Sequence, residues 1–387
     1  MNPFVSPPKT RLGADEIQAI LRQYSLRLRD FAAIPQGTIN SNYCVYSDEG
    51  TLFLRVCEGK SLADAAFESS LIWHLGTRGL RTPPLWRTRS GSPFVPFRPG
   101  QPVMLFSWVE GRQLTDAELD EAYAFHIGEL LAQLHLSTAD LRHGHVGIYT
   151  SRHIADRLQR MQNDALAQAA VGSVLTSLAR ELEWLSRTRL RTLPRGIGHS
   201  DLFPDNLLFP KKPPRHRLGS LSTPPQHSGW VLDLEQAATV PLIYDLAVSL
   251  LACCAPVPEL AMQTATDHDH DEPPEQPEAA SDSMADATAA SDSGRMGPLQ
   301  SHTARALVAG YQSLRALSSE EWRGLYAELR FAAVRFTITR LTDVHRYGSV
   351  APISVVAGKD FRAFLWRLHR LIATSDEQLC AHLQQPF

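Results

Sequence analysis

The sequence predicts an α+β fold of two lobes, a small antiparallel β-rich lobe followed by a larger, mainly helical lobe. Its 387 residues suffice for two domains or one large two-lobed unit. Up to about residue 110, short apolar runs alternate with polar residues, which is strand and hairpin patterning. Beyond that point apolar residues recur every three or four positions, as in amphipathic helices. We therefore expect lobes at 1–110 and 111–387.

The first lobe should contain five strands and one long helix. Helical apolar spacing predicts a short helix over 15–24 before the first strand. A 3.6-residue period predicts the long helix over 61–80, with Gly79 at its C-terminal cap. The strand candidates are "LRLRDFAAI" (26–34), "SNYCVYS" (41–47), "TLFLRVC" (51–57) and two further runs that end in "QPVMLFSWVEG" (101–111).

The second lobe should be helical except around one polar loop. That loop, at 199–206, interrupts the helices and is followed by a short apolar strand in "GWVLDLEQAA" (229–238). The expected helices span 115–137, 152–163, 173–189, 244–254, 301–316, 319–346 and 359–373.

Two segments do not fit a packed core. Residues 257–300 are acidic and rich in Ala, Ser and Pro, with no Lys or Arg from 257 to 294, so they predict a disordered insertion. Within it, His268 and His270 could bind a metal, although flexible acidic tracts of this kind bind metals weakly. The basic, Pro-rich stretch 210–229 is expected to be an enlarged hairpin tip between two strands.

Composition excludes several classes of function. A net charge of −3 gives no reason to expect a nucleic-acid partner, and 43% hydrophobic residues is close to the globular average. No stretch reaches the roughly 18 apolar residues of a membrane span. The five cysteines include no C-x-x-C pair, and their odd number argues against a disulfide framework. We expect a cytoplasmic protein without membrane association, as a monomer or homodimer.

The loop "HSDLFPDN" (199–206) has the residues that phosphoryl transfer requires. Asp201 can accept a hydroxyl proton, while Asn206 and the later Asp233 offer oxygen ligands to Mg²⁺. The spacing H-x-D-x-x-x-x-N is that of the protein-kinase catalytic loop. In this interpretation His199 anchors the loop through backbone carbonyls rather than moving protons. A Ser-His-Asp hydrolase is disfavoured because its nucleophile elbow has the pattern G-x-S-x-G, and Leu202 stands where the second glycine is needed.

The remaining parts of a kinase can be sought upstream of this loop. The turn in "QGTINSNY" (36–43) presents Gly37 and Asn40, and its backbone N–H groups could reach phosphates. Arg55 lies in a strand where protein kinases have Lys, and Glu68 lies on the helix that follows. Two alternatives stay open: Arg55 could face solvent on its strand, and Glu68 could lie on a solvated helix face.

These motifs give the chain a resemblance to a known superfamily. It resembles the aminoglycoside phosphotransferases and choline kinases, and within them the homoserine kinase branch. The resemblance covers nearly the whole chain outside the two unusual segments. It rests on "GTINSNY" (37–43), "LFLRV" (52–56), "LLAQLHLST" (130–138), "GHSDLFPDNLLF" (198–209), "LDLEQA" (232–237), "YDLAVSL" (244–250) and "GYQSLRALSSEEW...FAAVRFTITRL" (310–341).

The resemblance implies a protein-kinase-like bilobal fold, ATP and Mg²⁺ as cofactors, and L-homoserine as the acceptor in threonine biosynthesis. It implies that Asp201 is the catalytic base and contacts the acceptor, that Asn206 and Asp233 bind Mg²⁺, and that Arg55 and Glu68 manage the ATP phosphates. The segment "FSWVEG" (106–111), with Ser107 and Val109, would contact adenine as the hinge.

Acceptor recognition is the part that the residues leave most open. Arg335 and Arg340 lie five positions apart on one expected helix and could clamp a carboxylate, or form interhelical ion pairs instead. His135 is expected to be a packed helix residue. Two other functions remain possible: a kinase of the same superfamily that acts on an amino sugar, choline or an aminoglycoside, and a nucleotide-binding pseudokinase.

Overall fold

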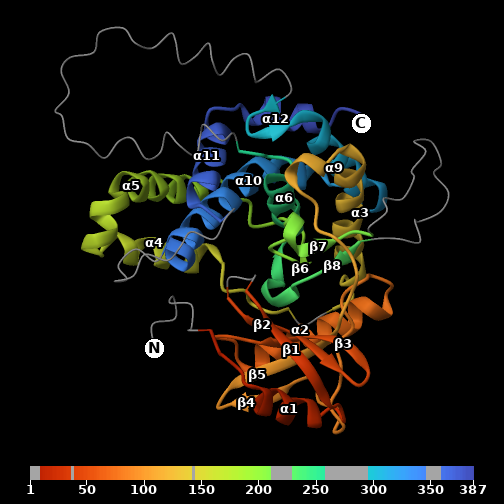
Figure 1. Cartoon of the computed structure of the whole chain (residues 1–387). Helices are drawn as coiled ribbons and strands as arrows, with labels where there is room; N and C mark the ends of the chain where they lie inside the picture. The colour runs from red at the N-terminus through yellow and green to blue at the C-terminus, as the bar shows by residue number, and fades with distance from the viewer. Residues whose placement is uncertain (1–8, 36–38, 142–143, 211–228, 258–294, 346–358) are drawn as a thin grey trace.

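The computed structural model describes residues 9–35, 39–141, 144–210, 229–257, 295–345 and 359–387. It has two lobes, with the β-rich N-terminal lobe below the helical C-terminal lobe in the view of Figure 1. Gly37, most of the basic stretch at 210–229 and residues 258–294 of the acidic segment lie outside the described residues. The described helices include none that is long and apolar enough to cross a membrane.

The N-terminal lobe is a five-stranded antiparallel sheet of order β1-β2-β3-β5-β4. Apolar side chains alternate along β2, where Tyr43 and Val45 are buried and Tyr46 is exposed, because one face of this strand packs on the core. Helix α1 (Ala14–Arg22) buries Ile17, Ile20 and Leu21 against that face. The strands are β1 (Leu28–Ile34), β2 (Ser41–Ser47), β3 (Gly50–Val56), β4 (Val95–Arg98) and β5 (Gln101–Ser107), which confirms the predicted set.

Helix α2 (Leu62–Thr77) carries the side chain that pairs with β3. It begins at a capping box, in which the Ser61 hydroxyl accepts the N–H of Asp64 at 3.2 Å. It ends before Gly79, whose φ of +85° suits a glycine that terminates a helix, as the sequence predicts. Between these caps its inner face buries Glu68, Leu71 and Leu75.

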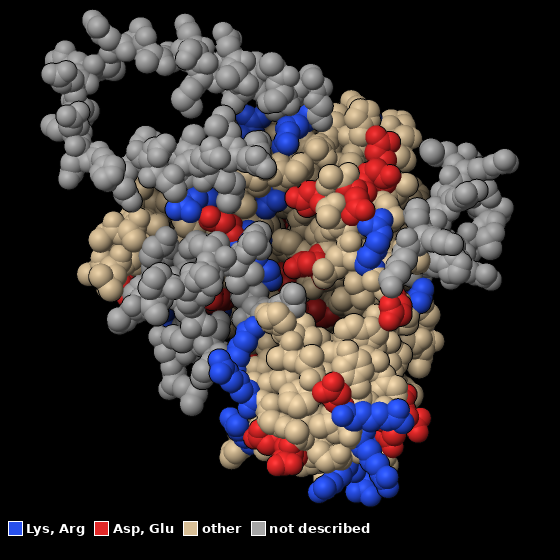
Figure 2. Space-filling model, in the orientation of Figure 1, with Lys and Arg blue, Asp and Glu red and all other residues tan. Residues whose placement is uncertain are grey.

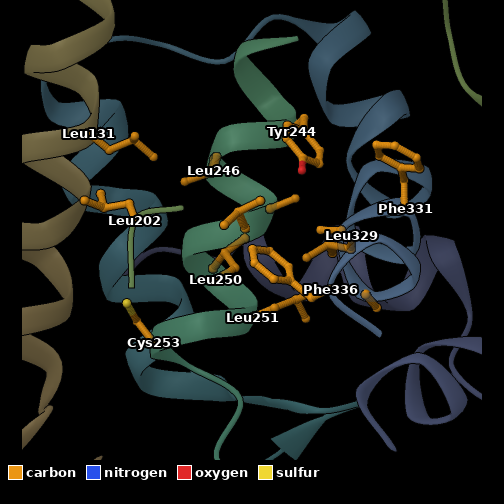
Figure 3. Close-up of a cluster of buried hydrophobic side chains, with 14 of the residues drawn as sticks. Leu131, Leu202, Tyr244, Leu246, Leu250, Leu251, Cys253, Leu329, Phe331 and Phe336 are labelled. Carbon is orange, nitrogen blue, oxygen red and sulfur yellow. The ribbon is translucent and has the colours of Figure 1, made fainter. Parts of the chain in front are cut away.

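The C-terminal lobe is built around helix α6 (Leu242–Cys253). Figure 3 shows Leu246 and Leu250 of α6 between neighbouring helices, with Phe331 and Phe336 on the far side. Helices α3 (Glu121–Ser137) and α9 (Ser301–Leu314) approach closely, because a Cβ at Gly310 would lie 1.8 Å from the Phe125 carbonyl oxygen. The other helices are α4 (Ser151–Gln162), α5 (Ala165–Thr188), α10 (Ser319–Thr339), α11 (Phe361–Ile372) and α12 (Asp376–Leu383).

Several predicted boundaries are wrong. Helix α10 stops at Thr339 and becomes a π-helical turn over Arg340–His345, where one continuous helix to 346 was expected. Helix α5 begins at Ala165 rather than 173, because Asp164 caps it and a kink at Val171 conceals the period. The end of the predicted disordered segment is also structured: 295–300 form the hairpin β10–β11 (Arg295–Met296, Leu299–Gln300), which buries Leu299 completely.

Candidate active site

The loop at 199–206 is fixed on its inner side by one buried carboxylate. Strand β6 (Arg195–Gly198) leads into it, and Ser200 takes a left-handed φ of +65°. The backbone N–H groups of His199 and Ser200 each donate to Asp245 of α6 at 2.7 Å. Asp245 is fully buried and is also 3.0 Å from His135 Nε2. The unusual turn before Asp201 is therefore held by charge-assisted hydrogen bonds.

The two histidines near this loop are structural, as the sequence predicts. His199 is fully buried, and its Nε2 lies 2.8 Å from the carbonyl oxygen of Leu232. His135 lies in the core of α3 between Asp245 and the Tyr311 hydroxyl, which is 2.7 Å from its Nδ1. Sequence reasoning missed Asp245 itself. A single carboxylate inside the apolar run "YDLAVSLL" was the available signal, since buried carboxylates need partners.

We expect Asp245→Asn to lower the free energy of unfolding by about 3 kcal/mol, because the amide removes the charge that these donors share. Burial alone would raise the pKa of Asp245, but the His135 hydrogen bond and charge and the Ser200 N–H lower it below the ordinary 3.8. A carboxylate with a lowered pKa stabilises the fold above its unfolded value and loses this effect as the pH falls through its folded value. Urea titrations should therefore show the difference at pH 7 and a shrinking difference below about pH 4. An equal loss at all pH values would contradict this account.

Asp201 and Asn206 are brought together by the turn between them. The 3₁₀ turn η2 (Pro204–Asn206) begins at Pro204 and returns the chain, so that Asn206 Nδ2 donates to the Asp201 carbonyl oxygen at 2.8 Å. The same amide nitrogen lies 3.5 Å from Asp201 Oδ2. Since the nitrogen is used in this way, the amide oxygen of Asn206 is left to face a cation. The predicted spacing of five residues therefore corresponds to a real contact.

The carboxylate of Asp201 is held by two side chains from elsewhere in the chain. Gln236 Nε2 donates to its Oδ2 at 3.2 Å, and Arg335 Nη1 lies 3.5 Å from its Oδ1. Arg335 Nη2 in turn donates to Gln236 Oε1, which fixes the orientation of the amide. Burial raises the pKa of Asp201, and the Arg335 guanidinium opposes that effect. Sequence reasoning missed Gln236, because its role depends on two residues far away in the sequence.

Arg335 is nevertheless not an interhelical ion-pair residue. It is 1% exposed, and its guanidinium carbon lies 4.2 Å from the ring centre of Tyr149 and 3.7 Å from that of Phe336. Arg335 lines the same cavity as Asp201. Its contact with an acceptor in that cavity stays a prediction. Its contacts in the structure are with the Asp201 carboxylate and with the amide of Gln236.

Asp233 lies at the end of the short strand β8 (Trp230–Val231) and opens the turn η3 (Leu234–Gln236). The Leu232 N–H donates to the Asn206 carbonyl oxygen at 2.9 Å, which ties this strand to the catalytic loop. The side chain of Asp233 is 38% exposed. Its partial burial and the nearby Glu235 carboxylate raise its pKa. The ionised form of such a carboxylate is unfavourable in the free protein, and binding of a cation stabilises it.

The residues present fit Mg²⁺ better than a transition metal. Among the described residues, no three His, Cys, Asp or Glu side chains converge as a ready-made metal site. Mg²⁺ needs fewer protein ligands, because it keeps several waters and also binds substrate phosphates. Asn206 and Asp233 would offer one amide oxygen and one carboxylate oxygen to such an ion, and this ligand pair stays a prediction. Figure 2 shows acidic side chains recessed in the hollow between the lobes.

Arg55 and Glu68 form a buried ion pair in the first lobe. Arg55 Nη2 and Glu68 Oε1 are 2.5 Å apart, and each residue is 5% exposed. Both alternatives, a solvent-facing arginine and a solvated glutamate, are therefore wrong. Arg55 also reaches across the cleft, with Nη1 3.2 Å from Asp233 Oδ1. This places its positive charge next to the expected metal ligand, while contact with ATP phosphates stays a prediction.

Asn40 and the hinge occupy the edges of the cleft. The Asn40 side chain donates to Glu235 of the other lobe at 2.5 Å and accepts from the Glu58 N–H at 3.1 Å, so its amide is already engaged. Lys60 also crosses the cleft and donates to the Glu235 carbonyl oxygen at 2.8 Å. Ser107 ends β5, and Val109 follows it in the connection to the second lobe. Phosphate contacts of Asn40 and adenine contacts of Ser107 and Val109 stay predictions.

A cavity of about 510 Å³ opens beside Asp201 and is large enough for a small acceptor. Its walls come from the catalytic loop, the end of α10 with its π turn, and α11. Charged residues of both signs line it, among them Asp201, Arg335, Arg340, Asp360 and Arg367.

Known proteins resemble this chain in sequence and in fold. Residues 30–282 match the model of the phosphotransferase enzyme family. A homoserine kinase of Nitrobacter winogradskyi is 29% identical over 339 residues, which cover 86% of each chain. One of Methylocella silvestris is 28% identical over 374 residues, covering 95% of this chain and 96% of the relative. The structure of a microcompartment-associated aminopropanol kinase is similar with a TM-score of 0.57 at 17% identity, covering 96% of this chain and 99% of that one.

Proposed function

Because the chain belongs to the phosphotransferase enzyme family, we propose that it transfers the γ-phosphate of ATP to the side-chain hydroxyl of L-homoserine and forms O-phospho-L-homoserine, as in threonine biosynthesis. The observation that carries the proposal is the convergence of Asp201, Asn206 and Asp233 at the cleft between the lobes. The curated relatives named homoserine kinase, which align over most of the chain, support this acceptor.

Asp201 has the position of the base in this reaction. Its carboxylate lines the acceptor cavity, and Gln236 and Arg335 fix its orientation. It accepts the hydroxyl proton as the acceptor oxygen bonds to the γ-phosphorus and the bond from that phosphorus to ADP breaks. Holding the hydroxyl in line with the phosphate contributes most of the acceleration, because this transition state needs little covalent help.

Asn206 and Asp233 would hold Mg²⁺, which neutralises the charge that develops on the phosphate oxygens. Glu68 holds the Nη2 atom of Arg55, and this keeps the Nη1 atom beside Asp233 at the proposed phosphate site. A buried arginine that is already paired on one side is a fixed positive charge, and it needs no reorganisation when phosphates bind. Ser107 and Val109 would contact the adenine from the hinge.

Other acceptors of the superfamily share the catalytic loop and differ in the cavity. We expect the purified protein to form ADP from Mg-ATP with L-homoserine, and to do so at least 100-fold less efficiently with choline, an amino sugar or an aminoglycoside. A coupled assay of ADP release over this panel measures the preference as a ratio of kcat/KM. A preference for any of the other three acceptors would overturn the acceptor and leave the phosphotransferase chemistry in place.

A pseudokinase is the alternative from a different class. The presence of Asp201, Asn206 and Asp233 in one cleft disfavours it, because a binding module does not need a base. Calorimetry with Mg-ATP, followed by the acceptor assay, separates the two: tight nucleotide binding without turnover on any acceptor would favour the pseudokinase.

A further inference from the structure

Two arginines, the buried Arg367 and the half-buried Arg340, line the acceptor cavity away from Asp201's own partners. Arg340 comes from the π turn after α10, and Arg367 comes from α11. Their guanidinium carbons lie 4.6 Å and 4.4 Å from the ring centre of the same residue, Phe364. Both line the cavity that contains Asp201. The end of α10 at Thr339 produces this arrangement, because the π turn changes the direction in which Arg340 projects.

Neither arginine is paired with a carboxylate among the described residues. Arg340 Nη1 donates to the Asp360 carbonyl oxygen at 2.7 Å, and Arg367 Nε donates to the Ala255 carbonyl oxygen at 2.8 Å. The carboxylate of Asp360 forms an ion pair with Arg362, with Nη1 of Arg362 3.0 Å from Oδ2 of Asp360. Other buried or half-buried arginines of this lobe do have acidic partners, as in the pairs Arg157–Asp343, Arg189–Glu328 and Arg330–Glu181.

This arrangement is costly without an anion. Burial lowers the pKa of Arg340 to about 10, and burial together with the charge of Arg340 lowers that of Arg367 to about 9. Two desolvated cations that repel each other gain from a shared negative group. A guanidinium also presents paired donors that match the two oxygens of a carboxylate. The cavity therefore has a preformed place for an anionic group next to the catalytic base.

We propose that Arg340 and Arg367 together bind the α-carboxylate of an amino-acid acceptor and so determine its selection. This inference rests on the proposed phosphotransfer to L-homoserine. It assigns Arg367, which sequence reasoning did not single out, to acceptor recognition. It also separates the two arginines expected to act together: Arg340 holds the acceptor carboxylate, whereas Arg335 positions Asp201.

The test compares L-homoserine with 3-amino-1-propanol, which is the same molecule without its carboxylate. Arg367→Met and Arg340→Met keep a long, unbranched apolar stem and remove the charge. We expect each to lower kcat/KM for L-homoserine about 100-fold, the value of a charged hydrogen bond, and to leave that for 3-amino-1-propanol unchanged. The KM for ATP should stay the same. Arg323→Met is the matched control, because Arg323 is an exposed arginine on α10.

Two further readouts keep the inference separate from the proposed function and from simple misfolding. Thermal unfolding should show that neither variant is less stable than the parent, because each removes a desolvated positive charge that has no carboxylate partner among the described residues. Calorimetry should show that L-homoserine binds the parent and not Arg367→Met, whether or not turnover occurs. Equal losses with both acceptors, or a raised KM for ATP, would overturn the carboxylate assignment. Failure of the parent to phosphorylate any amino-acid hydroxyl, with binding intact, would overturn the proposed function instead.

Discussion

Asp201→Asn is expected to lower kcat by about 1000-fold, the effect of removing a general base from a transfer that also depends on positioning. Asparagine keeps an oxygen for Gln236 and Arg335 to contact, so the loop geometry should persist. The amide cannot accept the hydroxyl proton, and it no longer aligns the acceptor through a charged hydrogen bond. Steady-state kinetics with saturating Mg-ATP and L-homoserine measure the change.

The control for this variant is Asp140→Asn. Asp140 is a half-exposed carboxylate that pairs with Arg78 on the surface, far from the cleft. Its loss should leave kcat within about twofold, since exposed pairs contribute little. Retention of more than a tenth of the parent kcat by Asp201→Asn would show that Asp201 is not the base.

Asp233→Asn should produce the second large effect, a loss of about 100- to 1000-fold in activity, which a higher Mg²⁺ concentration partly restores. The backbone of Asp233 is left-handed at φ +55°, a conformation that asparagine adopts readily. The variant therefore removes the charge and keeps the turn. Activity titrated against Mg²⁺ at fixed ATP should show a raised half-saturation concentration as well as a lower maximum.

Stability provides an independent check of this account. Burial and the Glu235 carboxylate raise the pKa of Asp233, so its neutral replacement should relieve desolvation and repulsion and leave the metal-free protein equally or more stable. The increase in Tm on adding Mg-ATP should shrink at the same time, because the variant binds the ligand less tightly. A destabilised variant with an undiminished Mg-ATP shift would mean that Asp233 has a structural role.

Residues that act through local spacing were predictable from the sequence. Asp201 and Asn206 are joined by a tight turn, so their separation of five residues implies their contact. Arg55 and Glu68 also meet as expected, because strand β3 and helix α2 follow each other in the chain and their side chains form a close ion pair. The five strands and α2 follow from alternating and 3.6-residue apolar periods, which depend only on neighbouring residues.

Residues that act through tertiary contacts were not predictable in this way. Gln236 becomes important because α10 places Arg335 beside it, 99 residues further along the chain. Asp245 supports His199 and Ser200 from a helix that the sequence marks only as apolar. Arg367 and Arg340 lie over the same ring, that of Phe364, from two different elements, and the helical period of the sequence continues through the π turn that carries Arg340 without a break. In each case, packing between distant elements determines the role.

The carboxylates of the cleft are not arranged for maximum stability of the free protein. Asp233 lies close to other carboxylates, and Asp201 is a half-buried acid with one guanidinium beside it. Such clusters are unfavourable in the free protein and become favourable when cations and phosphates bind. Under the proposed carboxylate site, Arg340 and Arg367 would behave in the same way with the opposite charge: their proximity is unfavourable in the free protein and becomes favourable when an anion binds.

The measurement that tests the central claim most directly is ³¹P nuclear magnetic resonance of the reaction of the parent protein with Mg-ATP and L-homoserine. The account predicts that the γ-phosphate signal of ATP is replaced by ADP signals and one new phosphate monoester, which proton coupling assigns to the homoserine side-chain oxygen. The monoester should be absent with Asp201→Asn over the same period. Release of inorganic phosphate alone, or no change in the ATP signals, would contradict the account.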